Sequence, residues 1–343
     1  MSRLLLRRWA VAGLLVPCLL AVFGVRAVRG LSVLETIAET GVIDLGVRSD
    51  LVPFGYRHSD GDLTGYCIDF VDLLRRQLLD PLNRRLPLGV RLFPTDSQPE
   101  FELAVDRIVQ LDCGPHAIAA TRDRPVAVSI PFFVTGVQFF VKTGEGAIDP
   151  DSDLEGKAIG VIRGTTAQTY LQTEYPLADL KVFQGSYGIR RGIEGVISGR
   201  LDAFATDGIV AIGEMARRGL SANEYQLIPN IPLTCETYGM LLPPEDPQWK
   251  AFVNRAIASP EHERIWNRWF RSMMTDLNLD LDGSSIVNFE GTADRCFEKI
   301  ERSSFDPDSI EKVRMAIGER RSPLPYFRFH FLFSKQISFT VID

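Results

Sequence analysis

The chain has 343 residues, of which 45% are apolar and 24% charged, the composition of a globular protein with enough residues for more than one domain. The formal net charge of −6 is spread along the sequence. No basic stripe and no run of Lys and Arg interleaved with aromatic residues occurs, so we expect no nucleic acid partner.

The first segment in chain order has the pattern of a secretory signal peptide. Three arginines within the first eight residues precede an uncharged apolar stretch over residues 9–25. Val25 and Ala27 then place small residues at the −3 and −1 positions of a cleavage site. We therefore predict a signal peptide over residues 1–27 and a mature protein in the periplasm. The alternative is an uncleaved membrane anchor, because the apolar stretch is almost long enough to span a bilayer.

Between residues 31 and 270, short apolar segments typical of strands alternate with segments of helical periodicity. The predicted strands include residues 42–47, 158–162 and 201–206, and the predicted helices include residues 66–79 and 187–198. In the first helix, apolar residues at spacings of four, three and four form one stripe: Cys67, Val71, Leu74 and Leu78. This alternation predicts an α/β fold with mostly parallel sheets.

The alternation falls into two blocks, which predicts two lobes. A polar stretch over residues 149–154 opens the second block. Two apolar extended segments, residues 132–142 and 237–242, are expected to connect the blocks. A helical stretch over residues 248–270 follows, and we expect it to pack on the first block. The chain would then cross between the lobes twice, and two crossing strands make a hinge.

The predicted division of the chain has four parts. They are a signal peptide over residues 1–27, a first lobe over residues 31–136 and 238–274, a second lobe over residues 137–237 with hinge strands at its ends, and a C-terminal extension over residues 275–343. In the extension, four phenylalanines alternate with other residues, which is the period of a strand with one apolar face: Phe327, Phe329, Phe331 and Phe333. We assign the extension no function.

Four cysteines lie beyond the signal peptide: Cys67, Cys113, Cys235 and Cys296. Four cysteines allow three disulfide pairings, and the sequence does not choose among them. Free buried thiols are the alternative.

The segment over residues 117–124 has side chains that suit a free amino acid. Such a ligand presents a carboxylate and an ammonium close together, and its site requires a guanidinium, backbone donors and an acidic group opposite. The segment follows a predicted strand through residues 111–113, and ligands of open α/β sheets bind at such strand ends. Arg124 would bind the carboxylate through two parallel hydrogen bonds. The alternative is an ordinary surface arginine beside Arg122.

Two further segments with suitable side chains lie in the second block. Gly164 permits a tight turn before a predicted helix, where the hydroxyls of Thr165 and Thr166 and the first N–H groups would bind an anion. The alternative is a threonine that only caps the helix. Asp207 ends a predicted strand and would accept the ammonium of the ligand. The alternative is an aspartate that caps a loop.

Motifs of enzymes and of cofactor sites are absent from the sequence. The four histidines do not have the spacing of metal ligands beside a carboxylate: His58, His116, His262 and His330. There is no GxSxG elbow, no Walker loop and no glycine-rich dinucleotide fingerprint. We therefore expect no metal, no cofactor and no enzymatic activity.

Six sequence motifs, taken in their order along the chain, resemble the motifs of a known protein family. They read GVIDLGVRSDLVPFGY, LTGYCIDF, LDCGPHAIAATRDRPVAVSIPFF, LEGKAIGVIRGTTAQTY, GRLDAFATD and YGMLLP, and they span about residues 31–270. Together they resemble family 3 of the bacterial extracellular solute-binding proteins, whose fold is shared with the ligand-binding core of ionotropic glutamate receptors. The resemblance implies a two-lobed α/β periplasmic-binding-protein fold of type II, with the ligand cleft between lobes that a two-strand hinge joins.

The resemblance also implies roles for single residues. Arg124 falls on the arginine of a T-x-x-R segment that starts at Thr121, and this arginine binds the α-carboxylate of the ligand. Thr165 and Thr166 fall on the G-[ST]-T pair, which also holds the carboxylate. Asp207 falls on the acid that receives the α-ammonium.

The chain departs from the family pattern at two places. Ala119 stands five residues before the arginine, where the family often has a hydroxyl residue, so only a backbone contact is expected there. Ala117, at the start of the same segment, is expected to line the site as well. Leu51 and Val52 precede the Pro-Phe of the first motif, where the family commonly has an aromatic residue that covers the ligand.

The resemblance implies an extracytoplasmic binding protein that captures a free L-amino acid and delivers it to the permease of an ABC transporter in the inner membrane. One alternative is a periplasmic enzyme similar to cyclohexadienyl dehydratases, which need a general acid in the cleft. Product formation from prephenate or arogenate separates this enzyme from a binding protein. The other alternative is an amino-acid sensor, which would normally carry a transmembrane helix and a signalling module after residue 270.

Overall fold

The computed structural model describes residues 31–58, 60–95, 101–144, 148–152, 154–184 and 187–276. The predicted signal peptide, Cys296 and all but the first two residues of the predicted extension lie outside these residues. Within the described part of the chain, no helix combines the length and the apolar character that a membrane span requires.

The first sheet has a parallel core to which antiparallel strands are added. The core strands are β5 (Gly89–Pro94), β1 (Val42–Val47) and β6 (Leu111–Ala117), and β1 is parallel to both neighbours. The added strands are β14 (Glu236–Leu242), β7 (Ala127–Val128) and β8 (Phe133–Thr135), with β14 antiparallel to β6, β7 and β8. A small antiparallel sheet of β2 (Asp50–Leu51), β3 (Gly55–Arg57) and β4 (Leu63–Thr64) completes this lobe's strands in the described residues.

The second sheet has the order β11-β10-β12-β9-β13. The bounds of its strands are Asp179–Phe183 for β11, Ala158–Ile162 for β10, Ala203–Asp207 for β12, Val137–Lys142 for β9 and Tyr225–Ile228 for β13. β10 is parallel to β11 and β12, whereas β9 is antiparallel to β12 and β13. The chain therefore forms two α/β lobes, each built around its own sheet.

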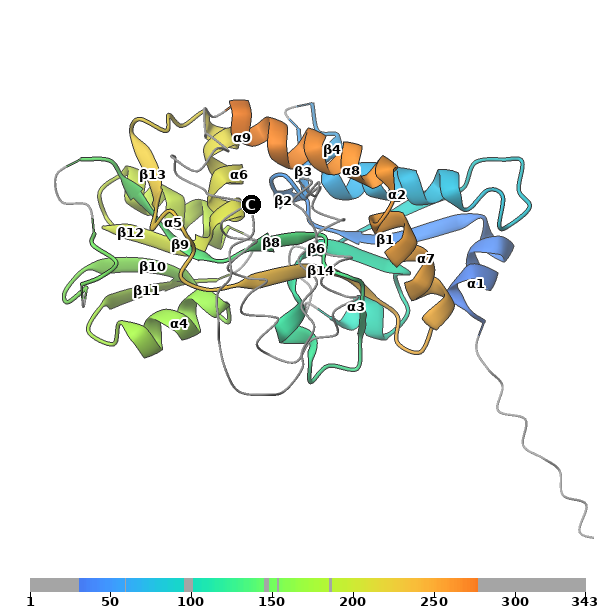
Figure 1. Cartoon of the computed structure of the whole chain (residues 1–343), viewed down its shortest axis with the longest axis horizontal. Helices are drawn as coiled ribbons and strands as arrows, with labels where there is room; N and C mark the ends of the chain where they lie inside the picture. The colour runs from blue at the N-terminus through green and yellow to red at the C-terminus, as the bar shows by residue number, and fades with distance from the viewer. Residues whose placement is uncertain are drawn as a thin grey trace, which may run out of the picture. The chain divides into compact units, whose positions relative to one another are not determined.

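The expectation of mostly parallel sheets is wrong for the strands that connect the lobes. The chain leaves the first sheet after β8 and enters the second at β9, then returns from β13 to β14. β9 and β14 run antiparallel to the strands beside which they are inserted, because each enters its sheet from the other lobe rather than through a helical crossover. β8, which precedes the first connection, pairs with β14, which follows the second (Figure 1).

The two connections between the sheets touch at Gly136. The Val137 amide donates to the Thr234 hydroxyl at 3.0 Å. A Cβ on Gly136 would lie 2.0 Å from the carbonyl oxygen of Thr234, so a side chain there would force the connections apart.

Helices cover both faces of each sheet (Figure 1). In the first lobe they are α1 (Val33–Thr40), α2 (Tyr66–Gln77), α3 (Glu102–Val105), α7 (Pro247–Ile257) and α8 (Pro260–Trp266), followed by a π-helical turn (Asn267–Arg271) and α9 (Ser272–Asp276). In the second lobe they are α4 (Thr166–Glu174), α5 (Gly188–Ile197) and α6 (Gly208–Arg218). The helices predicted at residues 66–79 and 187–198 are confirmed as α2 and α5.

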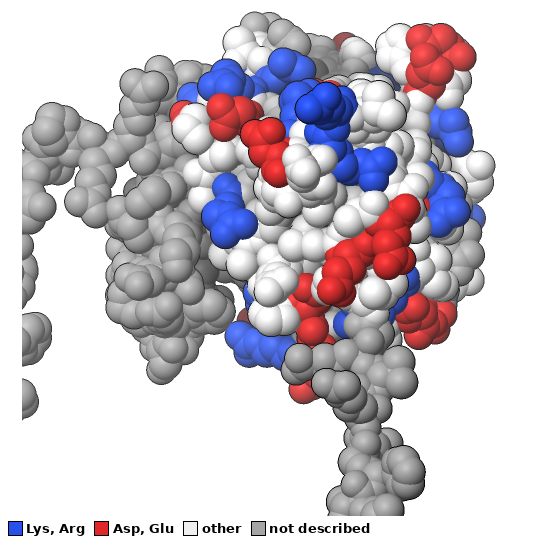
Figure 2. Space-filling model, turned by 90° about the vertical axis from the view of Figure 1, so that its right-hand side faces the viewer, with Lys and Arg blue, Asp and Glu red and all other residues white. Residues whose placement is uncertain are grey.

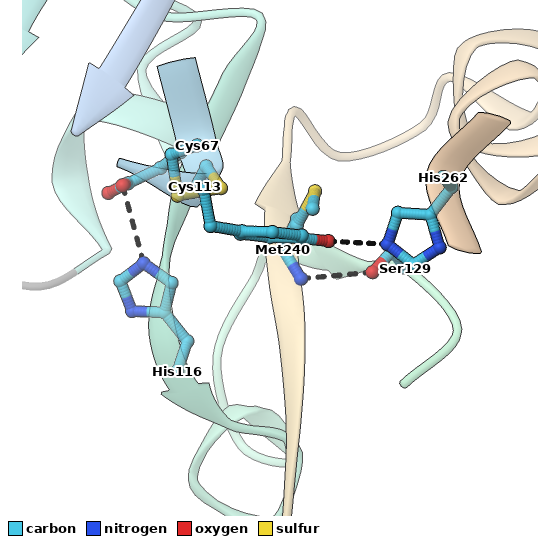
Figure 3. Close-up of a disulfide and its surroundings, with 8 residues drawn as sticks. Cys67, Cys113, His116, Ser129, Met240 and His262 are labelled. Carbon is cyan, nitrogen blue, oxygen red and sulfur yellow. Dashed lines mark hydrogen bonds and ion pairs between the residues drawn. A yellow bond between two sulfur atoms is a disulfide. The ribbon is translucent and has the colours of Figure 1, made fainter. Parts of the chain in front are cut away.

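The predicted apolar stripe of α2 lies in the core, since Cys67, Val71, Leu74 and Leu78 are all buried. Cys67 is bonded to Cys113 of β6, with 5.6 Å between the Cα atoms, so this disulfide joins α2 to the first sheet (Figure 3). Cys235 is also disulfide-bonded. The alternative of free thiols is therefore wrong for these three cysteines.

An aromatic cluster fills the first lobe between its sheet and the C-terminal helices. Phe54, Phe133 and Phe270 pack with centroid distances of 4.5–6.2 Å, and all three are fully buried. Tyr66 joins the cluster, and its hydroxyl lies 2.7 Å from His262 Nε2. The cluster gives this part of the molecule a rigid interior.

Basic and acidic side chains are interspersed on the face that Figure 2 shows. Opposite charges also pair within single helices of the molecule, as Arg264 does with Glu261 of α8. This face offers no broad positive field for a phosphate backbone.

Candidate ligand-binding site

The first-lobe half of the candidate site follows the end of β6. Ala117 ends the strand, and a 3₁₀ turn over Ile118–Thr121 comes next. The buried Thr121 hydroxyl donates to the Ile118 carbonyl at 2.8 Å, and the Arg124 amide donates to the Thr121 carbonyl at 3.0 Å. Ala119 is exposed on the turn. The turn therefore fixes the backbone of the segment, whereas the two arginine side chains that follow it project outward.

Arg124 is exposed, and its guanidinium carbon lies 5.3 Å from the centroid of the Phe101 ring. Arg122 is exposed as well. Within the described residues no carboxylate forms an ion pair with either arginine, and no hydrogen bond joins Arg124 to Asp207, Thr165 or Thr166. Both guanidiniums are therefore available to an anion.

Thr165 and Thr166 lie at the start of α4 in the second lobe. Thr165 is the N-cap: its hydroxyl accepts from the Gln168 amide at 3.4 Å and donates to the Ile162 carbonyl at 2.8 Å. Gly164 has a φ of +76°, which allows the tight turn that the sequence predicted. Thr166 is exposed in the first turn, so its hydroxyl and the helix terminus face outward together.

Asp207 ends β12 and occupies the N-cap position of α6, but its carboxylate makes no hydrogen bond to the helix. The alternative of a capping aspartate is therefore wrong. The carboxylate instead accepts a hydrogen bond from the hydroxyl of Tyr238 on β14. Burial raises the pKa of Asp207 to about 6, and the Tyr238 hydrogen bond lowers it in part.

Tyr238 was not identified as a site residue from the sequence. Its backbone pairs with Ala117 of β6, and its hydroxyl reaches Asp207 of β12, so this one residue links the two halves of the candidate site. The sequence signal is a tyrosine followed by an apolar run in the connecting strand, because a buried tyrosine hydroxyl requires a polar partner.

The lobes also touch away from these residues, at Val52 and α6. A Cβ on Gly213 of α6 would lie 2.0 Å from the Val52 carbonyl oxygen, so the helix passes this close only because residue 213 is glycine. Leu51 and Val52 are buried. These residues, which replace the aromatic position of the family, therefore pack against the other lobe.

Two α/β lobes joined by two connections, with polar side chains at the strand ends of both, are the architecture of a two-lobed ligand-binding protein. The family model for bacterial extracellular solute-binding proteins, family 3, matches residues 43–272. The chain belongs to this family. The expected two-lobed fold is confirmed. Membership of this family also confirms the expectation of a solute-binding protein.

Several characterised relatives are similar over most of the chain. The glutamate/aspartate import solute-binding proteins of Salmonella typhimurium and Escherichia coli are each 30% identical over 259 residues, which are 73% of this chain and 83% of theirs. The L-glutamate/L-aspartate-binding protein of Pseudomonas aeruginosa is 29% identical over 261 residues, with the same two coverages.

Solved structures of amino-acid-binding proteins share the fold. An ancestral amino acid-binding protein described as a precursor of cyclohexadienyl dehydratase matches with a TM-score of 0.56 and 21% identity, over 70% of this chain and all of that one (100%). Holo ArgBP from T. maritima matches with a TM-score of 0.54 and 20% identity, over 69% of this chain and 99% of that one.

Proposed function

We propose that this protein captures a free amino acid outside the cytoplasm and delivers it to the permease of an ABC transporter in the inner membrane. Acidic amino acids are the first ligands to test, because the relatives at 29–30% identity are named for glutamate and aspartate. The proposed location is the periplasm, reached through a signal peptide over residues 1–27.

The observation that carries the proposal is the carboxylate of Asp207, which is half-buried at the end of β12 and has no charged partner among the described residues. Among the described residues no Lys, Arg or His pairs with it, and a single phenol donates to it. A carboxylate accepts several hydrogen bonds, and a buried one without a cation is costly. The α-ammonium of an amino acid supplies both the missing charge and the missing donors.

The remaining site residues are assigned to the other end of the ligand. Arg124 binds the α-carboxylate through its two parallel N–H groups, and Thr121 shapes the turn that carries it. Thr165 and Thr166 present the N-terminus of α4 to the same carboxylate. The backbone of Ala117 and Ala119 lines the site.

The proposal includes a division of the chain into two lobes. Residues 31–136 with 238–274 form the first lobe, and residues 137–237 with hinge strands at their ends form the second. In this division Arg124 stands on one lobe and Asp207 on the other. A ligand gains both sets of bonds only when the lobes close, so its affinity depends on the closed state.

A thermal-shift screen of the mature protein against the common L-amino acids tests the function, beginning with glutamate and aspartate. A ligand present at 100 times its Kd stabilises the folded protein by about 2.7 kcal/mol, which raises the Tm by several degrees. No shift with any amino acid would contradict the proposal.

A further inference from the structure

The side chain of Tyr238 is fixed by ring contacts, and its backbone is paired on both sides. It is 1% exposed, its ring stacks on Phe133 with a centroid distance of 6.2 Å, and it packs edge to face with Phe54 at a centroid distance of 5.9 Å. Its backbone pairs with Ala117 on one side and Phe133 on the other. The direction of its hydroxyl is therefore set by the core of the first lobe, although the hydroxyl bonds a residue of the second.

The carboxylate of Asp207 accepts a hydrogen bond from this hydroxyl rather than from the amides of its own helix, α6. It stands at the N-terminus of α6, where an aspartate commonly accepts from the helix amides, yet none of these amides bonds it. The neighbours across the sheet and along the chain are Val137 of β9 and Gly208 of α6, which carry no charge. Within the described residues, Tyr238 of β14 is the titratable group that acts on this carboxylate.

We propose that Tyr238 is a positioning residue for the ammonium of the ligand: it holds the carboxylate of Asp207 toward the site, and ligand binding there releases the proton of Asp207. This inference rests on the proposed function. The ligand-free carboxylic acid loses its proton to solvent, and the carboxylate then forms an ion pair with the –NH₃⁺ group, which keeps all its protons. The phenol donates to an oxygen of the same carboxyl group in both states.

The coupling has a defined pH dependence. The pKa of Asp207 without ligand is about 6, and an adjacent ammonium favours the charged form, so the pKa with ligand is lower. Above pH 6 the affinity is expected to be constant. Below this value it falls, by up to tenfold per pH unit, because the proton competes with the ammonium.

Removal of the Tyr238 hydroxyl shifts this profile in a predictable direction. The hydrogen bond lowers the pKa of Asp207, so Tyr238→Phe raises it, and the loss of affinity begins at a higher pH. The phenylalanine keeps the ring that stacks on Phe133. Tyr225→Phe is the matched control, because Tyr225 is also buried and stacks on Phe140 at 5.4 Å, but it contacts no carboxylate in the described residues.

Calorimetry with L-glutamate at pH 5 to 8, in two buffers of different ionisation enthalpy, counts the protons released. We expect the unmodified protein to release about half a proton at pH 6 and almost none at pH 8. Tyr238→Phe should release more at pH 7 and show its affinity midpoint at least half a pH unit higher. Tyr225→Phe should match the unmodified protein. Aspartate and the amino acids found by the thermal-shift screen serve as probes if glutamate does not bind.

Each outcome bears on a different statement. If amino acids bind but no proton is released at pH 6, or if Tyr238→Phe leaves the midpoint unchanged, this inference is wrong and the proposed function stands. If no amino acid binds at any pH, the proposed function itself fails. Should circular dichroism show that Tyr238→Phe does not fold, Asp207→Asn tests the same coupling, because its residual binding must be independent of pH and release no proton.

Discussion

The two halves of the candidate site are held in different ways. In the second lobe, Thr165 and Asp207 each occupy the N-cap position of a helix that follows a strand, and hydrogen bonds fix each side chain. In the first lobe, the site segment is a 3₁₀ turn followed by two exposed arginines. The second half is therefore held in place by the fold, whereas on the proposed function the long side chains of the first would be ordered by the ligand carboxylate.

The same contrast appears in the buried ionisable groups of the lobes. His262 in the first lobe is fully buried, and its ring lies against Tyr66 with its Nε2 atom within hydrogen-bonding distance of the tyrosine hydroxyl. Asp207 in the second lobe accepts from a phenol, its one hydrogen-bond donor among the described residues. His262 therefore bonds a partner of its own lobe, whereas the partner of Asp207 lies on a strand of the other lobe.

The largest expected effect comes from removing either end of the site. Arg124→Ala and Asp207→Ala should each weaken amino-acid binding by roughly 30-fold or more, because truncating one partner of a buried charge pair costs about 2–5 kcal/mol. Arg124→Lys should restore only part of the affinity, since an ammonium cannot form the two parallel bonds of a guanidinium. Titration calorimetry measures all three, with circular dichroism as the folding check.

Arg122→Ala is the control for this pair of variants, because Arg122 is equally exposed and two residues away. It should bind with unchanged affinity. If Arg122→Ala loses affinity and Arg124→Ala does not, the assignment of the arginine is off by two residues. If neither arginine matters, the amino-acid carboxylate is not bound by this segment.

Acid should destabilise the first lobe through His262. Burial lowers the pKa of His262 to about 4, from 6.5 in an exposed histidine. Between these two values the unfolded chain binds a proton that the folded protein does not, so stability falls as the pH drops from about 6.5 to about 4. The loss is about 3 kcal/mol. Urea unfolding across this range should show a shallower loss for His262→Gln, and an equal slope would contradict the assignment.

The ligand-free second lobe should gain stability from Asp207→Asn. The pKa of Asp207 is raised from 3.8 to about 6, so the folded protein prefers the protonated acid, and above pH 6 the buried charge is destabilising. Asparagine removes the charge and keeps the shape. We expect a gain of about 2 kcal/mol at pH 8 in urea unfolding without ligand, together with weaker ligand binding. A less stable variant would show that the carboxylate has a cationic partner in the free protein.

The smallest expected effect concerns the contact between Val52 and α6. Gly213→Ala places a methyl group against the Val52 carbonyl oxygen and should weaken ligand binding by about tenfold or less, about 1.4 kcal/mol, because the lobes can no longer approach as closely. Gly89→Ala on β5 is the control, since a Cβ there meets its nearest neighbour at 3.4 Å. Unchanged affinity for Gly213→Ala would mean that this contact is not required in the bound state.

Features set by local pattern could be predicted from the sequence, and features set by contacts across the fold could not. The stripe of α2 and the strand at residues 42–47 follow from residue spacing alone. The bond between Cys67 and Cys113 spans 46 residues, and the contact of Tyr238 with Asp207 spans 31. Periodicity does not report such contacts, so the sequence predicts neither the disulfide pairing nor the contact of Tyr238 with Asp207.

For Asp207 the sequence predicts the position in the fold but not the direction of the side chain. Asp207 was placed at a strand end from the pattern of residues 201–206, and the structure has β12 end there. Whether its carboxylate turns toward α6 or away from it depends on the position of β14, which arrives from another part of the chain. The direction of a side chain at a strand end is a tertiary property.

The disulfide of the first lobe makes the stability of this protein depend on the redox state of its compartment. A cross-link over 46 residues stabilises the folded state by about 4 kcal/mol through the entropy of the unfolded chain. A reducing cytoplasm withholds that contribution, and an oxidising compartment supplies it. In a secreted chain, the newly made protein would thus stay easier to unfold, and easier to thread through a translocation channel, until it reaches the place where it works. Urea unfolding with and without a reductant measures the difference.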